Sequence, residues 1–177
     1  LGTFKLQQLE AKLKKNVWIR QAQVYFDSKD ILRVKVEERV PVARIFTSSG
    51  ASYYIDSSLK RLPLSDRTVL KLPVFTGFPT DRQRLKKTDS VLLRQIIQMS
   101  AFLRADPFWM AQVAQVDINI KREFEIIPTV GNHLIVFGKG DEIEKKFRKL
   151  RLFYEQVSAK AGFDKYSEIN IQYKGQV

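Results

Sequence analysis

The feature that most constrains the fold is the stretch 16–46, in which two runs of alternating apolar and polar residues flank a short polar cluster. Side chains alternate between the two faces of a β-strand, so each run places its apolar residues on one face. The cluster Asp27–Asp30 has the composition of a turn. The stretch therefore predicts a β-hairpin with one apolar and one solvated face. The residues expected to face inward are Ala22, Val24 and Phe26 in the first run and Leu32, Val34 and Val36 in the second.

A short amphipathic helix is expected before this hairpin, because Leu6, Leu9 and Leu13 recur at helical spacing among lysines. The helix would pack on the apolar face of the hairpin. Pro41 follows the second run and cannot donate a ladder hydrogen bond, so we expect the pairing to end there. These features place a domain boundary near Pro41, and we assign residues 1–44 and 45–177 to separate domains.

The larger part of the chain alternates between strand-like segments and two long helical patterns. The first helix is expected to begin at Asp89 as its N-cap, and the second to run from Asp141 to about Ala161. Asp141 and Glu144 have the spacing of a capping box, and Gly162 is a typical helix stop. The expected fold class is α+β: a helix on a β-hairpin, followed by a larger mixed β-sheet domain with two long helices.

The last predicted strand, EINIQYK, places Ile169, Ile171 and Tyr173 on one face. A terminal strand of this kind is a candidate sheet edge, and an open edge can pair with an extended segment of a partner. The strand could equally serve only to close the sheet. From the residues alone, both interpretations stay open.

The chain has a net charge of +12 and no cysteine, which excludes disulfides, thiolate metal sites and cysteine nucleophiles. The basic excess is spread along the chain, with one dense stretch at 82–87, and no aromatic–basic RNA signature accompanies it. Anionic headgroups or an acidic partner therefore explain the charge better than nucleic acid does. No apolar run approaches the roughly 18 residues needed to cross a bilayer.

Catalytic and metal-binding patterns are absent from the sequence. His133 is the only histidine, it has no second ligand at metal-binding spacing, and we interpret it as a turn or surface residue. Glu37 and Glu38 are neighbours on a strand and so point to opposite faces. The glycines at 138 and 140 lack the spacing of a phosphate-binding loop. We therefore expect no enzymatic activity, no metal and no cofactor.

Three segments in this order resemble the extracytoplasmic part of the FtsQ/DivIB family of bacterial cell-division proteins. The hairpin with its exit ERVPVA resembles the end of the family's POTRA domain. The segment YYIDSSLKRLPL followed by LPVFTGF resembles its Asp-containing hairpin and Leu-Pro stretch, and the strand INIQY resembles its final strand. The first strand and helix of a POTRA domain have no counterpart here, so the resemblance implies a partial POTRA-like domain.

The resemblance implies a non-catalytic scaffold that links early and late division proteins outside the cytoplasmic membrane, anchored by a single upstream helix. It also implies that FtsB, in complex with FtsL, adds a strand at the C-terminal edge. The expected partner-binding residues are Ile169, Ile171 and Tyr173, with Lys174 and Gly175 beside them. Gln172 stands where many relatives have an arginine, so detailed polar contacts need not be shared.

Two alternatives follow from the same residues. POTRA domains also occur in outer-membrane assembly and secretion machines that handle unfolded polypeptide. Those proteins carry POTRA repeats followed by a membrane barrel, whereas this chain has one such unit followed by a domain with two long helices. A nucleic-acid-binding protein is the third interpretation, and it predicts an affinity that falls steeply with salt.

Overall fold

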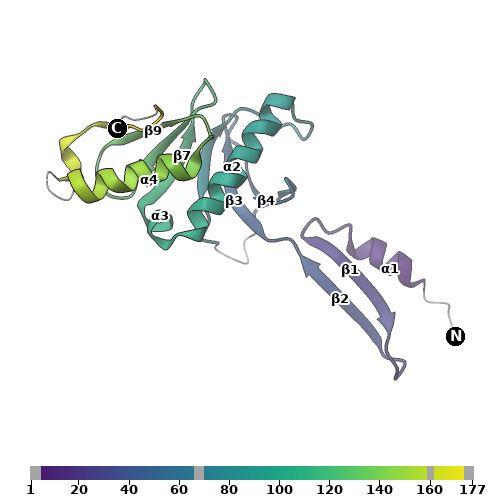
Figure 1. Ribbon diagram of the computed structural model, residues 1–177. Coiled ribbons are helices and arrows are strands. Elements are labelled where there is room, and N and C mark those ends of the chain that lie inside the picture. The colour runs from purple at the N-terminus through teal and green to yellow at the C-terminus, as the bar shows by residue number, and fades with distance from the viewer. Residues whose placement is uncertain (1–4, 66–69, 159–161, 174–177) are drawn as a thin grey trace. The chain divides into compact units, whose positions relative to one another are not determined.

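The computed structural model describes residues 5–65, 70–158 and 162–173 (Figure 1). The chain divides into two compact units, Leu1–Pro41 and Val42–Val177. One unit holds a helix and a hairpin, and the other holds helices and a large mixed sheet, which confirms the predicted α+β class. The observed division falls after Pro41, which begins a strand of the larger sheet. The assignment of domains to 1–44 and 45–177 stays a proposal.

The smaller unit contains α1 (Leu6–Leu13), β1 (Ile19–Phe26) and β2 (Leu32–Glu38). The two strands are antiparallel, with Val24 opposite Val34, as the alternation predicts. Asp27 shapes the turn, because one of its carboxylate oxygens accepts hydrogen bonds from the backbone N–H groups of Lys29 and Ile31 at 2.9 and 3.0 Å. The hairpin is therefore ordered by its own turn chemistry.

The apolar face of this hairpin is covered only in part, which corrects the expectation that β2 faces a core. Leu32, Val34 and Val36 are 37, 54 and 41 % exposed, and Phe26 at the end of β1 is 46 % exposed, whereas Ala22 and Val24 on β1 are buried. The helix α1 packs on β1, and the side chain of Glu10 accepts a hydrogen bond from the Val24 N–H at 2.9 Å. A single short helix placed over β1 leaves the apolar side chains of β2 in contact with solvent.

The larger unit is built on an eight-stranded sheet in the order β10-β9-β8-β7-β6-β3-β4-β5. Pairs β3–β6, β6–β7 and β9–β10 are parallel, and β4–β5, β7–β8 and β8–β9 are antiparallel. The strands are β3 (Pro41–Thr47), β4 (Ser52–Asp56), β5 (Arg61–Leu62), β6 (Val74–Phe78), β7 (Val113–Ile118), β8 (Phe124–Pro128), β9 (Leu134–Gly138) and β10 (Glu168–Asn170).

Helices α2 (Lys87–Ala105), α3 (Pro107–Gln112) and α4 (Ile143–Phe153) lie over one face of this sheet (Figure 1). A π-helical turn, Tyr154–Ser158, continues α4, and a 3₁₀ turn, Phe163–Lys165, precedes the last strand. Phe147 of α4 is fully buried, and its ring centroid lies 4.7 Å from those of both Phe102 and Trp109. The core of the larger unit is thus an aromatic cluster between helices and sheet.

Two predicted helix caps are wrong, and a basic side chain explains each difference. Helix α2 begins at Lys87, and Asp89 lies in its first turn, 2.7 Å from the guanidinium of Arg122. Helix α4 begins at Ile143, and Asp141 binds the ammonium group of Lys146 at 2.6 Å instead of capping the helix. In each case the carboxylate forms an ion pair with a basic side chain, which adds the attraction between opposite charges to the hydrogen bond.

Candidate functional site

The last described strand, β10, lies at the edge of the eight-stranded sheet. It pairs in parallel with β9, with Ile169 opposite Ile135. Within the residues that the structure describes, no strand pairs with the other side of β10. An open edge presents backbone donors and acceptors to a partner segment, which makes β10 the candidate interaction site.

The pairing with β9 determines which backbone groups of β10 are available. Ser167 accepts a hydrogen bond from the Leu134 N–H at 2.9 Å, and Ile171 donates one to the Val136 carbonyl at 3.0 Å. Backbone groups of successive strand residues point to opposite sides. The odd-numbered residues therefore face β9, and the N–H and C=O groups of Glu168 and Asn170 face the open side.

The predicted partner-binding side chains occupy two different environments. Ile169 and Ile171 are 4 and 0 % exposed and belong to the core, so a partner at this edge would meet their backbone rather than their side chains. Tyr173 is 61 % exposed. It lies beyond the end of β10, which is shorter than the predicted strand. Lys174 and Gly175 lie outside the described residues.

Asn170 and Gly138 explain why the strand ends where it does and how it approaches β9. The Asn170 side chain accepts a hydrogen bond from the Gln172 N–H at 3.2 Å, a local bond that competes with continued strand pairing. Gly138 has a φ of 75°, and a Cβ there would lie 2.8 Å from the Cβ of Gln172. The segment after β10 can pack this closely on β9 only because residue 138 is glycine.

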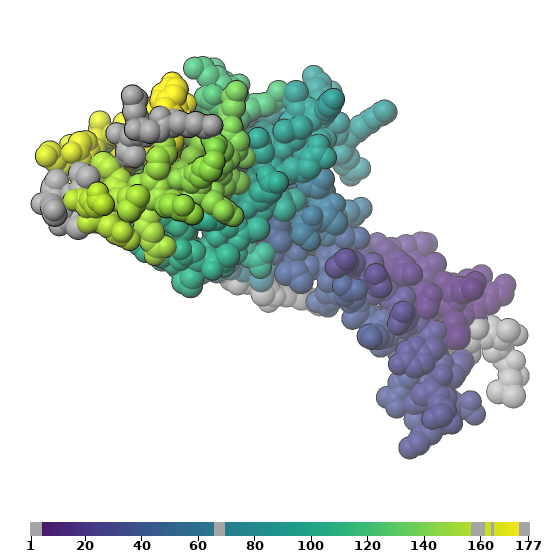
Figure 2. All heavy atoms as spheres, viewed as in Figure 1, coloured from purple at the N-terminus to yellow at the C-terminus, as the bar shows by residue number. Residues whose placement is uncertain are grey.

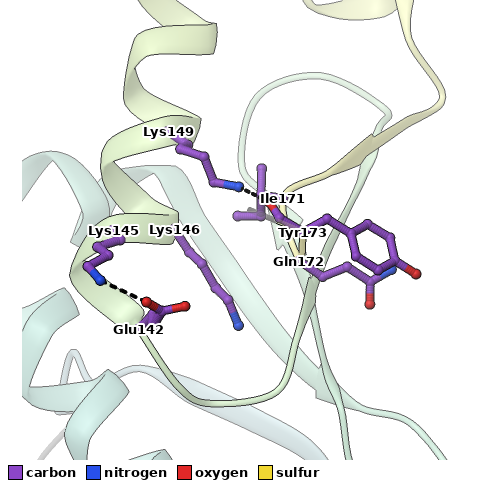
Figure 3. Close-up of a pocket in the computed structure, with 7 residues that line it drawn as sticks. All are labelled: Glu142, Lys145, Lys146, Lys149, Ile171, Gln172 and Tyr173. Atoms are coloured by element: carbon purple, nitrogen blue, oxygen red, sulfur yellow. Dashed lines mark hydrogen bonds and ion pairs between the residues drawn. The ribbon is translucent and has the colours of Figure 1, made fainter. Parts of the chain in front are cut away.

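A small pocket of about 200 Å³ lies between α4 and the segment that follows β10. Its walls carry three lysines and one glutamate (Figure 3). Figure 2 shows the yellow-green side chains of α4 spread over one face of the larger unit, beside the yellow C-terminal segment. The lining residues are Glu142, Lys145, Lys146, Lys149, Ile171, Gln172 and Tyr173.

The electrostatics of this pocket are set by Lys146, which is only 5 % exposed. Its ammonium group donates to the Asp141 carboxylate at 2.6 Å and to the Lys139 carbonyl at 2.7 Å. The hydrogen bond from Lys146 lowers the pKa of Asp141 below its ordinary value. Burial, together with repulsion from Lys146, lowers the pKa of Lys149. Three cationic side chains and one carboxylate thus line the pocket beside the sheet edge.

His133 is buried at 3 % exposure, which corrects its interpretation as a turn or surface residue. One ring nitrogen lies 3.0 Å from the hydroxyl of Tyr154, and the imidazole stacks on Phe163. Burial raises the pKa of Tyr154 to about 12. Among the described residues, no group of three His, Asp or Glu side chains is placed to hold a metal ion. In this setting His133 packs the connection that leads to β10.

Sequence reasoning identified the edge strand but missed the lysines of α4 and the role of Gly138. The lysines lie on the polar side of an amphipathic helix, where charged residues ordinarily face water. Only the fold brings them beside residues 171–173. None of the described helices is long and apolar enough to cross a membrane.

Comparison with protein families matches both units of the chain. Residues 40–177 match the family model described as "FtsQ/DivIB, C-terminal related", and residues 1–39 match "POTRA domain, FtsQ-type". The first match covers more than half of the chain. These matches favour the division-protein prediction over an outer-membrane assembly machine.

Curated relatives named "Cell division protein FtsQ" are similar over most of the chain. The protein of Syntrophotalea carbinolica is 28 % identical over 94 % of this chain and 59 % of its own length. That of Salinibacter ruber is 25 % identical over 94 % of this chain and 66 % of its own length. That of Geotalea daltonii is 26 % identical over 85 % of this chain and 55 % of its own length. The chain thus spans less than two thirds of each of these relatives.

Proposed function

Because the chain belongs to the FtsQ/DivIB family, we propose that it acts as a non-catalytic scaffold of the bacterial cell-division machinery. In this proposal it links early and late division proteins at the septum, on the extracytoplasmic face of the cytoplasmic membrane. An upstream helix would anchor it there. The names of its relatives and the matches to both units support a role in division.

The proposed partner at the C-terminal edge is an FtsB-type protein in complex with an FtsL-type protein. We propose that an extended segment of this partner adds a strand beside β10. The observation that carries the proposal is the open edge, where the backbone groups of Glu168 and Asn170 face away from β9. Strand addition obtains affinity from such groups and specificity from neighbouring side chains.

Tyr173 is the side chain best placed to add specificity at this edge. It is 61 % exposed, is the last of the described residues that line the pocket, and carries a large ring with a polar tip. Exposed aromatic residues of this kind often dominate the binding energy of an interface. We expect Tyr173→Ala to weaken partner binding by about 2 kcal/mol, close to thirtyfold in Kd.

The test is calorimetric titration of the protein with the extracytoplasmic segment of the FtsB-type protein from the same bacterium. Glu168→Pro removes a backbone donor on the open side of β10 and is compatible with pairing to β9, because edge strands accept proline there. We expect Glu168→Pro, like deletion of residues 168–177, to abolish binding. The matched control Glu168→Ala keeps the donor and should bind as the unchanged protein does.

Folding and surface controls accompany these variants. Circular dichroism must show that Glu168→Pro and the deletion variant remain folded, and Tyr25→Ala removes a tyrosine of similar exposure, 47 %, from the other unit. Tyr25→Ala should leave the affinity unchanged. The proposal fails if the unchanged protein does not bind the segment, or if folded Glu168→Pro binds as well as Glu168→Ala.

A further inference from the structure

The turn between β7 and β8 presents a large apolar side chain entirely to solvent. Ile120 is 101 % exposed, more than any other large apolar residue that the structure describes. The turn is held by Asn119, whose side chain accepts hydrogen bonds from the N–H groups of Lys121 and Glu123 at 2.9 and 3.1 Å. A hydrogen-bonded turn therefore keeps Ile120 away from the core.

The start of α2 lies beside this turn, at the same end of the sheet (Figure 1). Arg122 joins the two segments, because its guanidinium group lies 2.7 Å from the carboxylate of Asp89. A hollow of about 340 Å³ separates them, and Lys87, Val91 and Arg122 are among the residues that line it. Val91 is 42 % exposed, so the turn and the helix start form one surface with two exposed apolar side chains.

This surface has more basic than acidic side chains. Residues 79–90 and 119–123 contain six basic and three acidic residues, a net charge of +3. Arg122 is the basic residue that pairs with Asp89. The other five are exposed and form no ion pair with any residue that the structure describes. They are Arg82, Arg84, Lys86, Lys87 and Lys121.

The combination of unpaired cations with an exposed apolar residue is typical of a surface that meets a bilayer. Anionic headgroups attract Lys and Arg side chains, and a neighbouring apolar side chain enters the boundary between headgroups and acyl chains. A single exposed apolar residue is ordinary on a protein surface, and its place among unpaired cations is the informative feature. Only Lys87 of the five unpaired cations lines the hollow, so their charge is spread over the surface, as a broad anionic plane requires.

We propose that the surface formed by residues 82–91 and 119–122 docks onto an anionic lipid bilayer. Ile120 enters the headgroup region, and the basic side chains contact lipid phosphates. Because the attraction between exposed charges is screened by ions, the affinity should fall as the salt concentration rises. The inference goes beyond the proposed strand addition, since it concerns a different surface and a different class of partner.

The test is sedimentation of the protein with vesicles of phosphatidylcholine, either alone or mixed in equal parts with phosphatidylglycerol. We expect binding to the mixed vesicles only, and a loss of about fivefold in affinity for Lys121→Gln and for Ile120→Ser. The matched controls Lys60→Gln and Val130→Ser remove exposed residues of the same kinds from turns at the other end of the sheet. Both controls should bind as the unchanged protein does.

Insertion of residue 120 has a readout of its own. Ile120→Trp should shift its fluorescence emission to shorter wavelength when the mixed vesicles are added, and Val130→Trp should not. The native tryptophans are common to both variants and do not affect this comparison.

The inference is overturned if the mixed vesicles do not bind, or if Ile120→Ser binds them as tightly as the unchanged protein. It is also overturned if the protein binds polyglutamate but not the vesicles, which would identify an acidic protein as the partner. Ile120→Ser should bind the FtsB-type segment with unchanged affinity. A failure of bilayer docking would therefore leave the proposed function intact.

Discussion

The two units of this protein use the same alternation of apolar residues and reach opposite degrees of burial. In the larger unit, β3 alternates between buried and half-buried residues beneath a layer of helices. In the smaller unit, all residues of β2 are exposed, although their alternation is as regular. A sequence pattern therefore specifies a strand and its two faces, but not whether another element covers the apolar face.

The uncovered face of the smaller unit has a defined shape. A groove of about 540 Å³ runs between α1 and the hairpin, and mostly apolar side chains line it. The lining residues are Leu9, Lys12, Leu13, Asn16, Ile19, Val24, Leu32 and Val34. In the larger unit, by contrast, aromatic rings pack against Phe147 of α4 and leave its side chain fully buried. Side-chain truncation should therefore have very different consequences in the two units.

The largest expected effect is that of Phe147→Ala. Phe147 is fully buried against three aromatic rings, so its removal leaves a cavity, and we expect the free energy of unfolding to fall by about 3–5 kcal/mol. Val34→Ala, at a residue that is 54 % exposed, should change it by less than about 0.5 kcal/mol. Urea denaturation followed by Trp109 fluorescence, in a Trp18→Phe background, measures the first.

Amide hydrogen exchange of β1 and β2 measures the effect of Val34→Ala within its own unit. The comparison between the units breaks down if Val34→Ala destabilises the hairpin as much as Phe147→Ala destabilises the larger unit. That result would mean that the apolar face of β2 is covered in solution.

The ion pairs of the two units also differ in burial. Arg122→Gln leaves the carboxylate of Asp89, whose side chain is 5 % exposed, without its guanidinium partner, and we expect a loss of about 1–3 kcal/mol. In the smaller unit, Arg20 and Glu37 form a pair whose side chains are 60 and 52 % exposed, so Arg20→Gln should cost less than about 1 kcal/mol. Denaturant unfolding of each variant provides both values.

A rescue variant tests the reason for the larger loss. Asp89→Asn combined with Arg122→Gln replaces the buried charge by an amide and should recover part of the stability lost in Arg122→Gln alone. If the double variant is the less stable of the two, desolvation of the carboxylate is not the cause. Arg20→Gln needs no such rescue, because water solvates Glu37.

Most elements of the fold were predicted from the sequence, because they depend on local periodicity and turn chemistry. The hairpin, the helix before it and the helical stretches of the larger unit are of this kind. The predicted helix starts at Asp89 and Asp141 were wrong, because each carboxylate binds a basic side chain instead of capping the helix. The pairing of Asp89 could not be read from local sequence, since Arg122 is distant in the chain. The interpretation of His133 as a turn or surface residue was also wrong, because only the fold brings Tyr154 and Phe163 around its ring.

The sequence predicted that the candidate site contains a strand, but not which of its side chains are exposed. The sequence placed Ile169, Ile171 and Tyr173 on one face, and the structure buries the first two and exposes the third. The difference arises because Asn170 binds the Gln172 N–H and ends the strand before Tyr173. The lysines of α4 joined the site only through tertiary packing, which no local pattern encodes.

The smallest expected effects concern the dependence of stability on acidic pH. They can be measured for each unit separately. Hydrogen bonds from the backbone of Ile31 and Lys29 and from Arg33 lower the pKa of Asp27, and the hydrogen bond from Lys146 lowers that of Asp141. A lowered pKa in the folded state stabilises the fold above the unfolded value of about 3.9. The stabilisation is lost as the pH falls through the folded pKa. Asp27→Asn and Asp141→Asn should therefore reduce stability near neutral pH and match the unchanged protein at low pH.

Acid titration from about pH 5 to pH 2 checks this separation. Trp18 lies in the smaller unit and Trp109 in the larger, so single-tryptophan variants report one unit each. Asp27→Asn should flatten the pH dependence reported by Trp18 and leave that of Trp109 unchanged, and Asp141→Asn should do the reverse. If either variant changed the pH dependence reported by both tryptophans, the two units would unfold together. The stability of each unit would then not depend on its own burial alone.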